Sequence, residues 1–226
     1  SKNGLYCMVT HLRQDTAAEG NIQTFAEIIG LVGIRPFTIK YKGMVVPGGA
    51  AIGEFSYFNP RNSEADNDDC FRNYSTINEF LKDIEISLYK FGLKPKIKIF
   101  CPDESKKFYL VGVSSGAAIK SEFLEQIAGS IQVYVAAEME QSAIMTAQEL
   151  GITLIDVGHY ETELPGMQRL AKKLKADERT KHIPIVILTA YPNADELAKE
   201  AGADDYLSKP FELADLWNMA AKHTQF

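Results

Sequence analysis

The residues best suited to chemistry are a histidine and a glutamate four positions apart, His159 and Glu163, which follow an apolar stretch. Two side chains at this spacing can share one face of a helical turn. An imidazole and a carboxylate together suit zinc, iron or manganese. The pair is therefore the best candidate for metal ligation in the chain. A polar pair satisfied by water and neighbouring groups is the alternative.

A second candidate is the loop Ser114-Ser115-Gly116, which precedes an expected helix. Backbone N–H groups and two hydroxyls at such a place could hold a phosphate or sulfate anion. A turn of small residues that lets a helix pack closely is the alternative. The chain has no Walker-type loop and no Cys-His pair arranged as nucleophile and base. No catalytic residue is therefore assigned.

Composition and charge limit the possible partners. The 226 residues are 46% hydrophobic and 24% charged, as in soluble globular chains of one large or two small domains. The net charge of −6 gives no reason to expect a nucleic acid, and no apolar run approaches the roughly 18 residues that span a membrane. Three cysteines without metal-type spacing favour a reduced, cytoplasmic setting. No partner is evident.

The first part of the chain, residues 1–106, is expected to form a smaller α+β region. Its pattern predicts a strand over 5–10, a helix over 21–29, a hairpin over 35–58 interrupted at Pro47-Gly48-Gly49, and a strand over 96–100. Residues 59–73 are polar and acidic and predict a loop. Thr76 lies three residues before Glu79, a capping-box spacing that predicts a helix through about Tyr89.

From residue 107 the pattern changes to alternating strands and helices. Apolar segments over 108–113, 131–136, 152–157, 183–189 and 205–208 are each followed by a helical pattern. Nearly continuous apolar strands between helices predict a parallel sheet covered on both faces. Right-handed crossovers then favour a five-stranded, doubly wound, flavodoxin-like sheet of strand order 2-1-3-4-5 over residues 107–226.

Residues 4–174 resemble the NIF-three-like family, known as GTP cyclohydrolase 1 type 2 homologues. The resemblance rests on HLRQD at residues 11–15 and on GITLIDVGHYETELPG at residues 151–166. It implies a two-metal site in which Asp15, His159 and Glu163 match ligands, with His11 where a histidine often accompanies the aspartate. The N-terminal third of the family, which carries a His-His pair, has no counterpart here. The resemblance thus implies at most an incomplete site for one zinc, manganese or iron ion.

Residues 165–226 resemble the C-terminal half of a response-regulator (CheY-like) receiver domain. The segment GADDYLSKPF at residues 202–211 carries this resemblance. It implies that Thr189 and Lys209 match the hydroxyl and the lysine that contact a phosphoryl group, and that Asp156 could be the phosphoacceptor. The first parallel strand ends without the acidic pair that holds Mg²⁺ in phosphoryl transfer.

The two resemblances meet at residues 165–175 and together predict a fused chain. Residues 107–164 would then be NIF-three-like and residues 176–226 receiver-like. We expect an engineered or recombined α/β scaffold with no evolved activity. One alternative is a divalent-metal-dependent hydrolase of NIF-three-like type acting on a nucleotide or phosphoester; another is a receiver-like, phosphate-responsive module. The family tends to form ring-like assemblies, but part of that surface has no counterpart here, so a monomer or dimer is expected.

Overall fold

The computed structural model describes residues 11–55, 76–101, 103, 107–117, 119–189 and 193–223. The strand predicted over 5–10 and the loop predicted over 59–73 lie outside the described residues. The described chain divides into a larger unit, His11–Gly166, and a smaller unit that begins at Met167. Within the described residues, no helix is both long and apolar enough to cross a membrane.

The larger unit begins with two helices and a long hairpin. These elements are α1 (His11–Thr16), α2 (Asn21–Ile28), β1 (Leu31–Tyr41) and β2 (Met44–Phe55). The predicted hairpin is confirmed, but its turn lies at Lys42-Gly43, where φ is 45° and 78°. Two left-handed residues in succession are typical of the tight turn that matches the twist of a hairpin. Pro47-Gly48-Gly49 instead lies within β2, where the pairing register shifts between Ile39–Val46 and Phe37–Ala50.

The predicted capping box is confirmed at the start of α3 (Ile77–Tyr89). The Glu79 N–H donates to Thr76 Oγ1 at 3.3 Å, and the Thr76 N–H donates to Glu79 Oε2 at 2.9 Å. Phe80, Ile84 and Leu88 are spaced four apart and are all buried, so they form the apolar face of the helix. The Phe80 ring packs against Phe55 of the hairpin at 4.4 Å between centroids.

A six-stranded mixed sheet of order β1-β2-β4-β5-β6-β3 forms the centre of the larger unit. Its other strands are β3 (Lys98–Phe100), β4 (Leu110–Val113), β5 (Val133–Ala136) and β6 (Thr153–Asp156). Strands β4, β5 and β6 run parallel, and every other neighbouring pair is antiparallel. All residues of β5 and β6 are buried, as their apolar runs predict.

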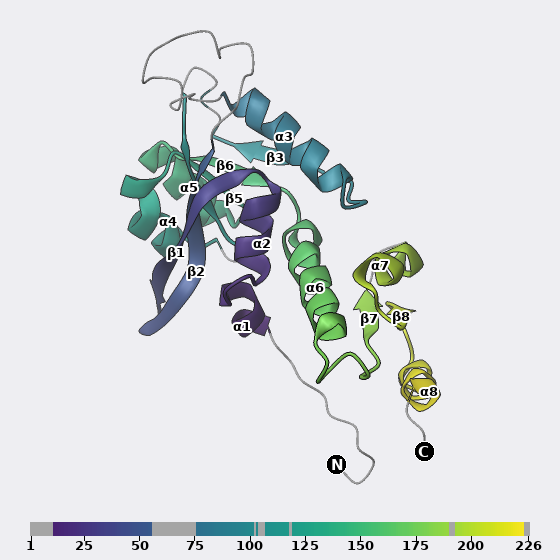
Figure 1. Ribbon diagram of the computed structural model, residues 1–226. Coiled ribbons are helices and arrows are strands. Elements are labelled where there is room, and N and C mark those ends of the chain that lie inside the picture. Colours follow the sequence, from purple (N-terminus) through teal and green to yellow (C-terminus); the bar gives the residue numbers. More distant parts are fainter. Residues whose placement is uncertain are drawn as a thin grey trace. The chain divides into compact units, whose positions relative to one another are not determined.

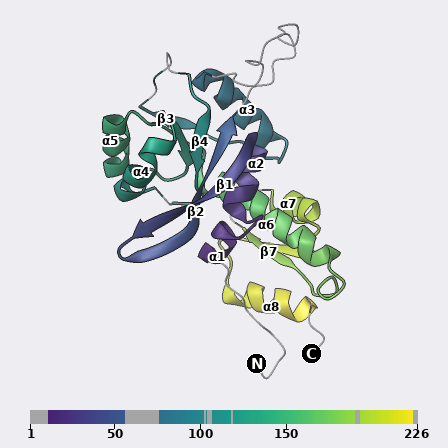
Figure 2. The same cartoon turned by 60° about the vertical axis from the view of Figure 1, so that its left-hand side comes forward.

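Helices cover both faces of this sheet. On one face lie α4 (Ser121–Ile127), the short 3-10 helix Ala128–Ser130 and α5 (Gln141–Leu150), and on the other lie α2 and α3 (Figure 1 and Figure 2). Leu124 of α4 and Ala147 of α5 share a buried cluster with Tyr134 and Leu154 of the sheet. The layers hold β4, β5 and β6 in a fixed register, and their carboxyl ends meet at one edge.

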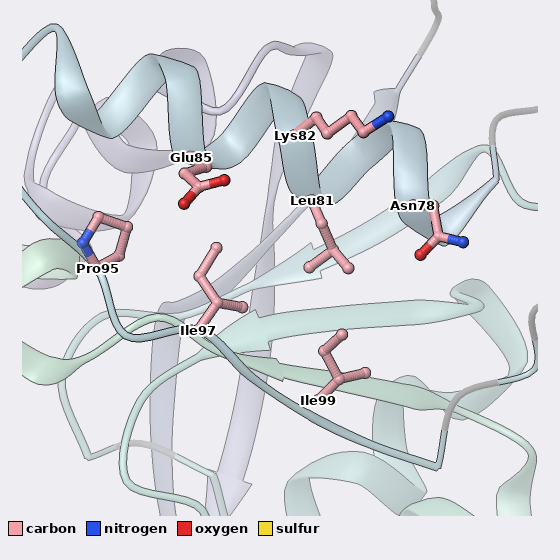
Figure 3. A pocket seen from close by; sticks show the side chains of 7 residues that line it. All are labelled: Asn78, Leu81, Lys82, Glu85, Pro95, Ile97 and Ile99. Atoms are coloured by element: carbon pink, nitrogen blue, oxygen red, sulfur yellow. The ribbon is translucent and has the colours of Figure 1, made fainter.

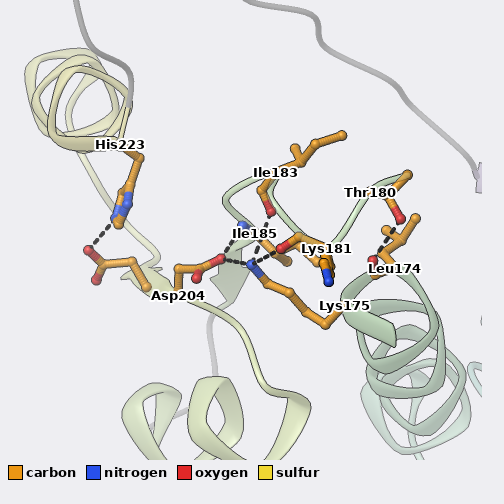
Figure 4. Close-up of polar contacts among 9 residues, drawn as sticks. Leu174, Lys175, Thr180, Lys181, Ile183, Ile185, Asp204 and His223 are labelled. Carbon is orange, nitrogen blue, oxygen red and sulfur yellow. Dashed lines mark hydrogen bonds and ion pairs between the residues drawn. The ribbon is translucent and has the colours of Figure 1, made fainter. Parts of the chain in front are cut away.

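The smaller unit contains a parallel pair of strands. Its elements after α6 (His159–Ala176) are β7 (Val186–Thr189), α7 (Ala194–Ala201), β8 (Asp205–Ser208) and α8 (Leu213–His223). The Lys175 ammonium pairs with Asp204 and donates to the Ile183 carbonyl at 3.0 Å (Figure 4). Asp204 Oδ2 also accepts from the Ile185 N–H at 2.7 Å. These contacts tie the chain that enters β7 to the chain that enters β8.

The prediction of a five-stranded parallel flavodoxin-like sheet is wrong. The predicted strands exist, but β4, β5 and β6 belong to the mixed sheet, whereas β7 and β8 form a separate two-stranded sheet. In the predicted order β4 would pair with β6, yet β2 occupies that edge of β4. Strand β3 likewise pairs with β6 along the edge expected for the fourth strand. Apolar patterns identify buried strands but do not specify which strand occupies a free edge.

Candidate functional site

The carboxyl edge of the three parallel strands gathers the candidate residues of the larger unit. The loop Ser114-Ser115-Gly116 follows β4, Ala137-Glu138 follows β5, and Val157-Gly158 connects β6 to α6. Ligands of α/β sheets bind beyond this end of the strands. The helix that follows β6 begins at His159, so His159 and Glu163 both lie in its first turns.

The imidazole of His159 is held between two carboxylates. Its Nε2 lies 3.0 Å from Glu163 Oε1, and its Nδ1 lies 3.0 Å from Glu138 Oε1. A carboxylate that accepts the Nδ1 proton fixes the tautomer and leaves Nε2 as the electron-pair donor, as in metal-binding histidines with an outer carboxylate partner. Glu138 adopts a left-handed backbone (φ 52°), which is uncommon for a residue with a side chain.

Gly116 lies directly in front of the histidine and glutamate, where no side chain would fit without a shift. A Cβ on Gly116 would lie 2.9 Å from Glu163 Oε1 and 3.0 Å from His159 Nε2. The Gly116 N–H donates to Thr162 Oγ1 at 2.9 Å, and this hydroxyl donates to the His159 carbonyl at 2.8 Å. The loop after β4 is thereby fastened to the first turn of α6, with its glycine facing the two donor atoms.

The electrostatics of this edge favour a positive charge. Burial lowers the pKa of His159, but the hydrogen bond with Glu138 and the charge of Glu163 outweigh it, so the pKa is raised overall. Burial, followed by the charge of Asp156, raises the pKa of Glu161. Asp156 Oδ1 accepts the Gly158 N–H at 3.0 Å. The negative charges of Asp156 and Glu161 therefore lie close enough to affect each other at this edge of the sheet.

Asp15 lies in the same unit, in α1, and is 9% exposed. Its Oδ1 accepts a hydrogen bond from Asn21 Nδ2 at 2.8 Å. The backbone of His11 starts α1, while its side chain lies outside the described residues. Among the described side chains, no group of three or more His, Cys, Asp and Glu converges to hold a metal ion. Of the four residues matched to metal ligands, His159 and Glu163 bring a nitrogen and an oxygen atom together, at 3.0 Å.

The loop predicted to bind an anion is buried beneath α6. Ser114 is fully buried and Ser115 is 6% exposed, and the Ser115 hydroxyl has no hydrogen-bond partner among the described residues. Burial raises the pKa of the Tyr134 phenol in β5 to about 12. Close packing against α6 is thus one role of this loop, and anion binding stays a prediction.

The residues matched to a phosphoryl site lie in different units. Asp156 is the last residue of β6, in the larger unit. Thr189 is the last residue of β7 and Lys209 directly follows β8, and both belong to the smaller unit. The Lys209 N–H donates to the Thr189 carbonyl at 2.7 Å, next to the cis peptide bond that joins Lys209 to Pro210. Their phosphate-related roles stay predictions.

A groove of about 520 Å³ lies elsewhere, between α3 and the chain over residues 95–99 (Figure 3). It contains none of the candidate side chains. Its lining residues are Asn78, Leu81, Lys82, Glu85, Pro95, Ile97 and Ile99.

Glu138 is the site residue that the sequence patterns missed. It comes just after the buried segment over 131–136, which places it at the same sheet edge as Ser114 and His159. Its position directly after a parallel strand is the sequence feature that could have identified Glu138 as a site residue.

Comparisons with known proteins place the chain in a family. The family model Duf34/NIF3 (NGG1p interacting factor 3) matches residues 1–194. A GTP cyclohydrolase 1 type 2 homolog from Treponema pallidum is 37% identical over 76 residues, covering 34% of this chain and 26% of that protein. The homolog from Nostoc sp. is 24% identical over 176 residues, covering 76% of this chain and 56% of that protein.

A solved structure shows the same fold. Reduced HcgD from Methanocaldococcus jannaschii superposes with a TM-score of 0.53 at 20% identity, covering 73% of this chain and 54% of HcgD. The chain therefore spans about half the length of HcgD and of the Nostoc homolog.

The interpretation as an engineered or recombined fusion is wrong. The family match continues from residue 1 to residue 194, across the predicted joint at 165–175. Matches to response regulators are short: the phosphate regulon protein PhoB of Pseudomonas aeruginosa is 47% identical over 57 residues, only 24% of this chain. The NIF-three-like resemblance is confirmed, and the chain belongs to the Duf34/NIF3 family.

Proposed function

We propose that this chain binds a divalent cation through His159 and Glu163 and acts as a metal-dependent hydrolase of a nucleotide or another phosphoester. The observation that carries the proposal is the 3.0 Å separation of His159 Nε2 and Glu163 Oε1. Two donors about 2.0–2.2 Å from one ion lie roughly 3.0–3.4 Å apart in common coordination geometries. The names of the relatives, GTP cyclohydrolase 1 type 2 homologs, support a nucleotide as the substrate class.

Three neighbours support a cation at this point. Glu138 accepts the Nδ1 proton, so that Nε2 faces the cation. Gly116 lies directly in front of both donors, and Thr162 fixes that glycine to α6. Because only two described side chains converge, water and substrate oxygens would fill the other positions. A bound Zn²⁺ or Mn²⁺ supplies Lewis acidity and a water of lowered pKa.

The test is metal content after loading with Zn²⁺ or Mn²⁺ and removal of the free ion. We expect the wild-type chain to retain about one equivalent by elemental analysis, and His159→Ala and Glu163→Gln to lose it, because each removes one converging donor. His182→Ala is the matched control, since His182 is exposed and belongs to the smaller unit. A wild-type chain without metal, or a His159→Ala variant that keeps it, would refute the proposal.

A further inference from the structure

We propose that the groove between α3 and residues 95–99 binds an extended segment of another protein, in which acidic and apolar residues alternate, as a strand added to the outer edge of β3. The proposal does not depend on the metal site. It rests on three features of this edge of the sheet: a backbone without a neighbouring strand, an apolar groove beside it, and lysines on the opposite face.

Strand β3 is the last strand of the mixed sheet. Its neighbour among the described strands is β6, with which it pairs antiparallel. In such a pair, alternate residues direct their N–H and C=O groups away from the neighbour, so the outer edge of β3 offers unpaired backbone groups. The preceding residues, 94–97, make no backbone–backbone hydrogen bond with another described residue. This stretch can therefore accept a further strand, as in peptide recognition by strand addition.

An apolar groove lies beside this edge. Leu81 of α3 points toward Ile97 and Ile99, which turn toward the helix (Figure 3). Exposure rises along the chain, from Leu93, which is fully buried, to Ile99, which is 37% exposed. The space between helix and strand thus opens toward β3. A ligand that covers Leu81, Ile97 and Ile99 would remove their remaining apolar surface from water, which is favourable.

The opposite face of the same stretch carries positive charge. Lys94, Lys96 and Lys98 alternate with the apolar residues, and all three are exposed. None of them forms an ion pair with another described residue. A second copy of this edge, paired so that apolar side chains stay in the groove, would place lysines opposite lysines, which is unfavourable. The charge therefore selects a different, acidic strand.

The two faces of β3 define the sequence pattern of the ligand. Successive side chains of a strand point to opposite faces, and residues directly opposite each other in neighbouring strands share a face. A ligand residue opposite Ile97 or Ile99 would face the groove, and one opposite Lys96 or Lys98 would face the ammonium groups. The preferred ligand thus has an apolar residue at every second position and aspartate or glutamate between them.

The helix side of the groove leaves this preference unchanged. Asn78, Lys82 and Glu85 line it at i, i+4 and i+7 on α3. The charges of Lys82 and Glu85 are opposite, so together they add no net charge, and the Asn78 amide is uncharged. The preference for an acidic ligand therefore comes from the lysines of the strand.

Fluorescence anisotropy of labelled eight-residue peptides with the full chain tests the proposal. The probe alternates glutamate and valine. One comparison peptide alternates lysine and valine, and the other has four glutamates followed by four valines. We expect the probe to bind with a Kd below about 1 mM and both comparison peptides to bind about tenfold more weakly or worse. The first comparison peptide reverses the charge, and the second breaks the alternation.

Variants assign the binding to this groove. Lys96→Glu combined with Lys98→Glu should reverse the preference, toward the lysine–valine peptide, because the repelled and attracted ligands exchange places. Leu81→Asp should weaken binding of the probe about tenfold or more, since it places a charge in the apolar groove. Lys172→Glu, which changes an exposed lysine on α6, is the matched control and should bind as wild type does. Thermal unfolding checks each variant, and the exposed lysine pair keeps the test valid if Leu81→Asp does not fold.

The other outcomes overturn the proposal. They are a wild-type chain that does not bind the glutamate–valine peptide, one that binds a comparison peptide equally well, and a double lysine variant with an unchanged preference. Sedimentation of the same samples examines a second copy as the occupant. A wild-type dimer that Leu81→Asp converts to a monomer would assign the groove to self-association instead.

Discussion

At the scale of single residues, the candidate site depends on an imidazole with a carboxylate on each ring nitrogen. Glu163 lies four residues from His159 in the helix, whereas Glu138 reaches His159 from the loop after β5. The two carboxylates have different tasks in our proposal. Glu163 would share the cation with Nε2, and Glu138 would hold the Nδ1 proton.

Two variants of Glu138 distinguish its hydrogen bond to the His159 ring from the negative charge of its carboxylate. Glu138→Ala removes both the acceptor and the charge, so we expect Zn²⁺ affinity to fall about tenfold or more. Glu138→Gln keeps an oxygen that can accept the Nδ1 proton and should lose less. Glu125→Ala, an exposed glutamate on α4, should bind as wild type does. Titration of Zn²⁺ against a chelating dye measures all three, and equal affinity for Glu138→Ala and wild type would remove Glu138 from the site.

At the scale of elements, α6 connects the candidate site to the packing of the larger unit. It begins directly after β6, so the strand fixes the position of His159. Pro165 lies inside the helix, where it supplies no N–H to the carbonyl of Glu161. Gly166 then meets α2. The beginning of this one helix thus serves both the ligand pair and the contact with Asn21.

Replacement of Gly166 by alanine should destabilise the larger unit. Helix propensity alone would favour alanine by about 1 kcal/mol. The added Cβ would meet Asn21 Cα at 2.6 Å, however, so backbone has to move, and overpacking of this kind costs roughly 1–3 kcal/mol. Gly129→Ala is the control because nothing lies within 4 Å of a Cβ there. Urea unfolding measures both; an unchanged or raised midpoint for Gly166→Ala would contradict the close approach.

The contact between β8 and α8 should make the smaller unit sensitive to acid. Hydrogen bonds from Lys222 and then from His223 hold the pKa of Asp205 far below its usual range. A lowered folded-state pKa contributes stability that is present above the unfolded value, near 3.9, and is lost as the pH falls towards the folded value. Because Lys222 is 64% exposed, water screens the pair, and we expect at most about 1 kcal/mol.

The measurement is thermal unfolding of wild type and Asp205→Asn between neutral and acid pH. The variant should melt below wild type at pH 7, and the difference should shrink below about pH 4, where Asp205 begins to lose its charge in the unfolded chain. Asp195→Asn, an exposed aspartate on α7, is the control. A difference that is constant over the whole pH range would exclude this ion pair as its cause.

At the scale of the whole molecule, the chain forms two compact units, and the family match reaches from the first into the second. The larger unit is a mixed sheet with helices on both faces, and it contains the candidate metal ligands. The chain spans about half of HcgD and of the Nostoc homolog. A monomer or dimer stays a prediction, which sedimentation of the purified chain would test.

The sequence by itself determined the local elements and the ligand pair. The capping box at Thr76, the strand segments that became β4 to β8, and the i, i+4 spacing of His159 and Glu163 each depend on residues close together in the chain. Periodicity and capping preferences act over one or two turns, so they can be read without tertiary structure.

Only the tertiary structure decided the strand partners and the surroundings of the ligand pair. Strand β2 took the edge of β4, and β3 took the edge of β6, which excluded the predicted parallel sheet. Glu138 met His159, and Gly116 met Glu163, across many residues of chain. The physical reason is that sheet pairing and packing depend on which edges and faces remain free once all elements are present, and no local pattern encodes that.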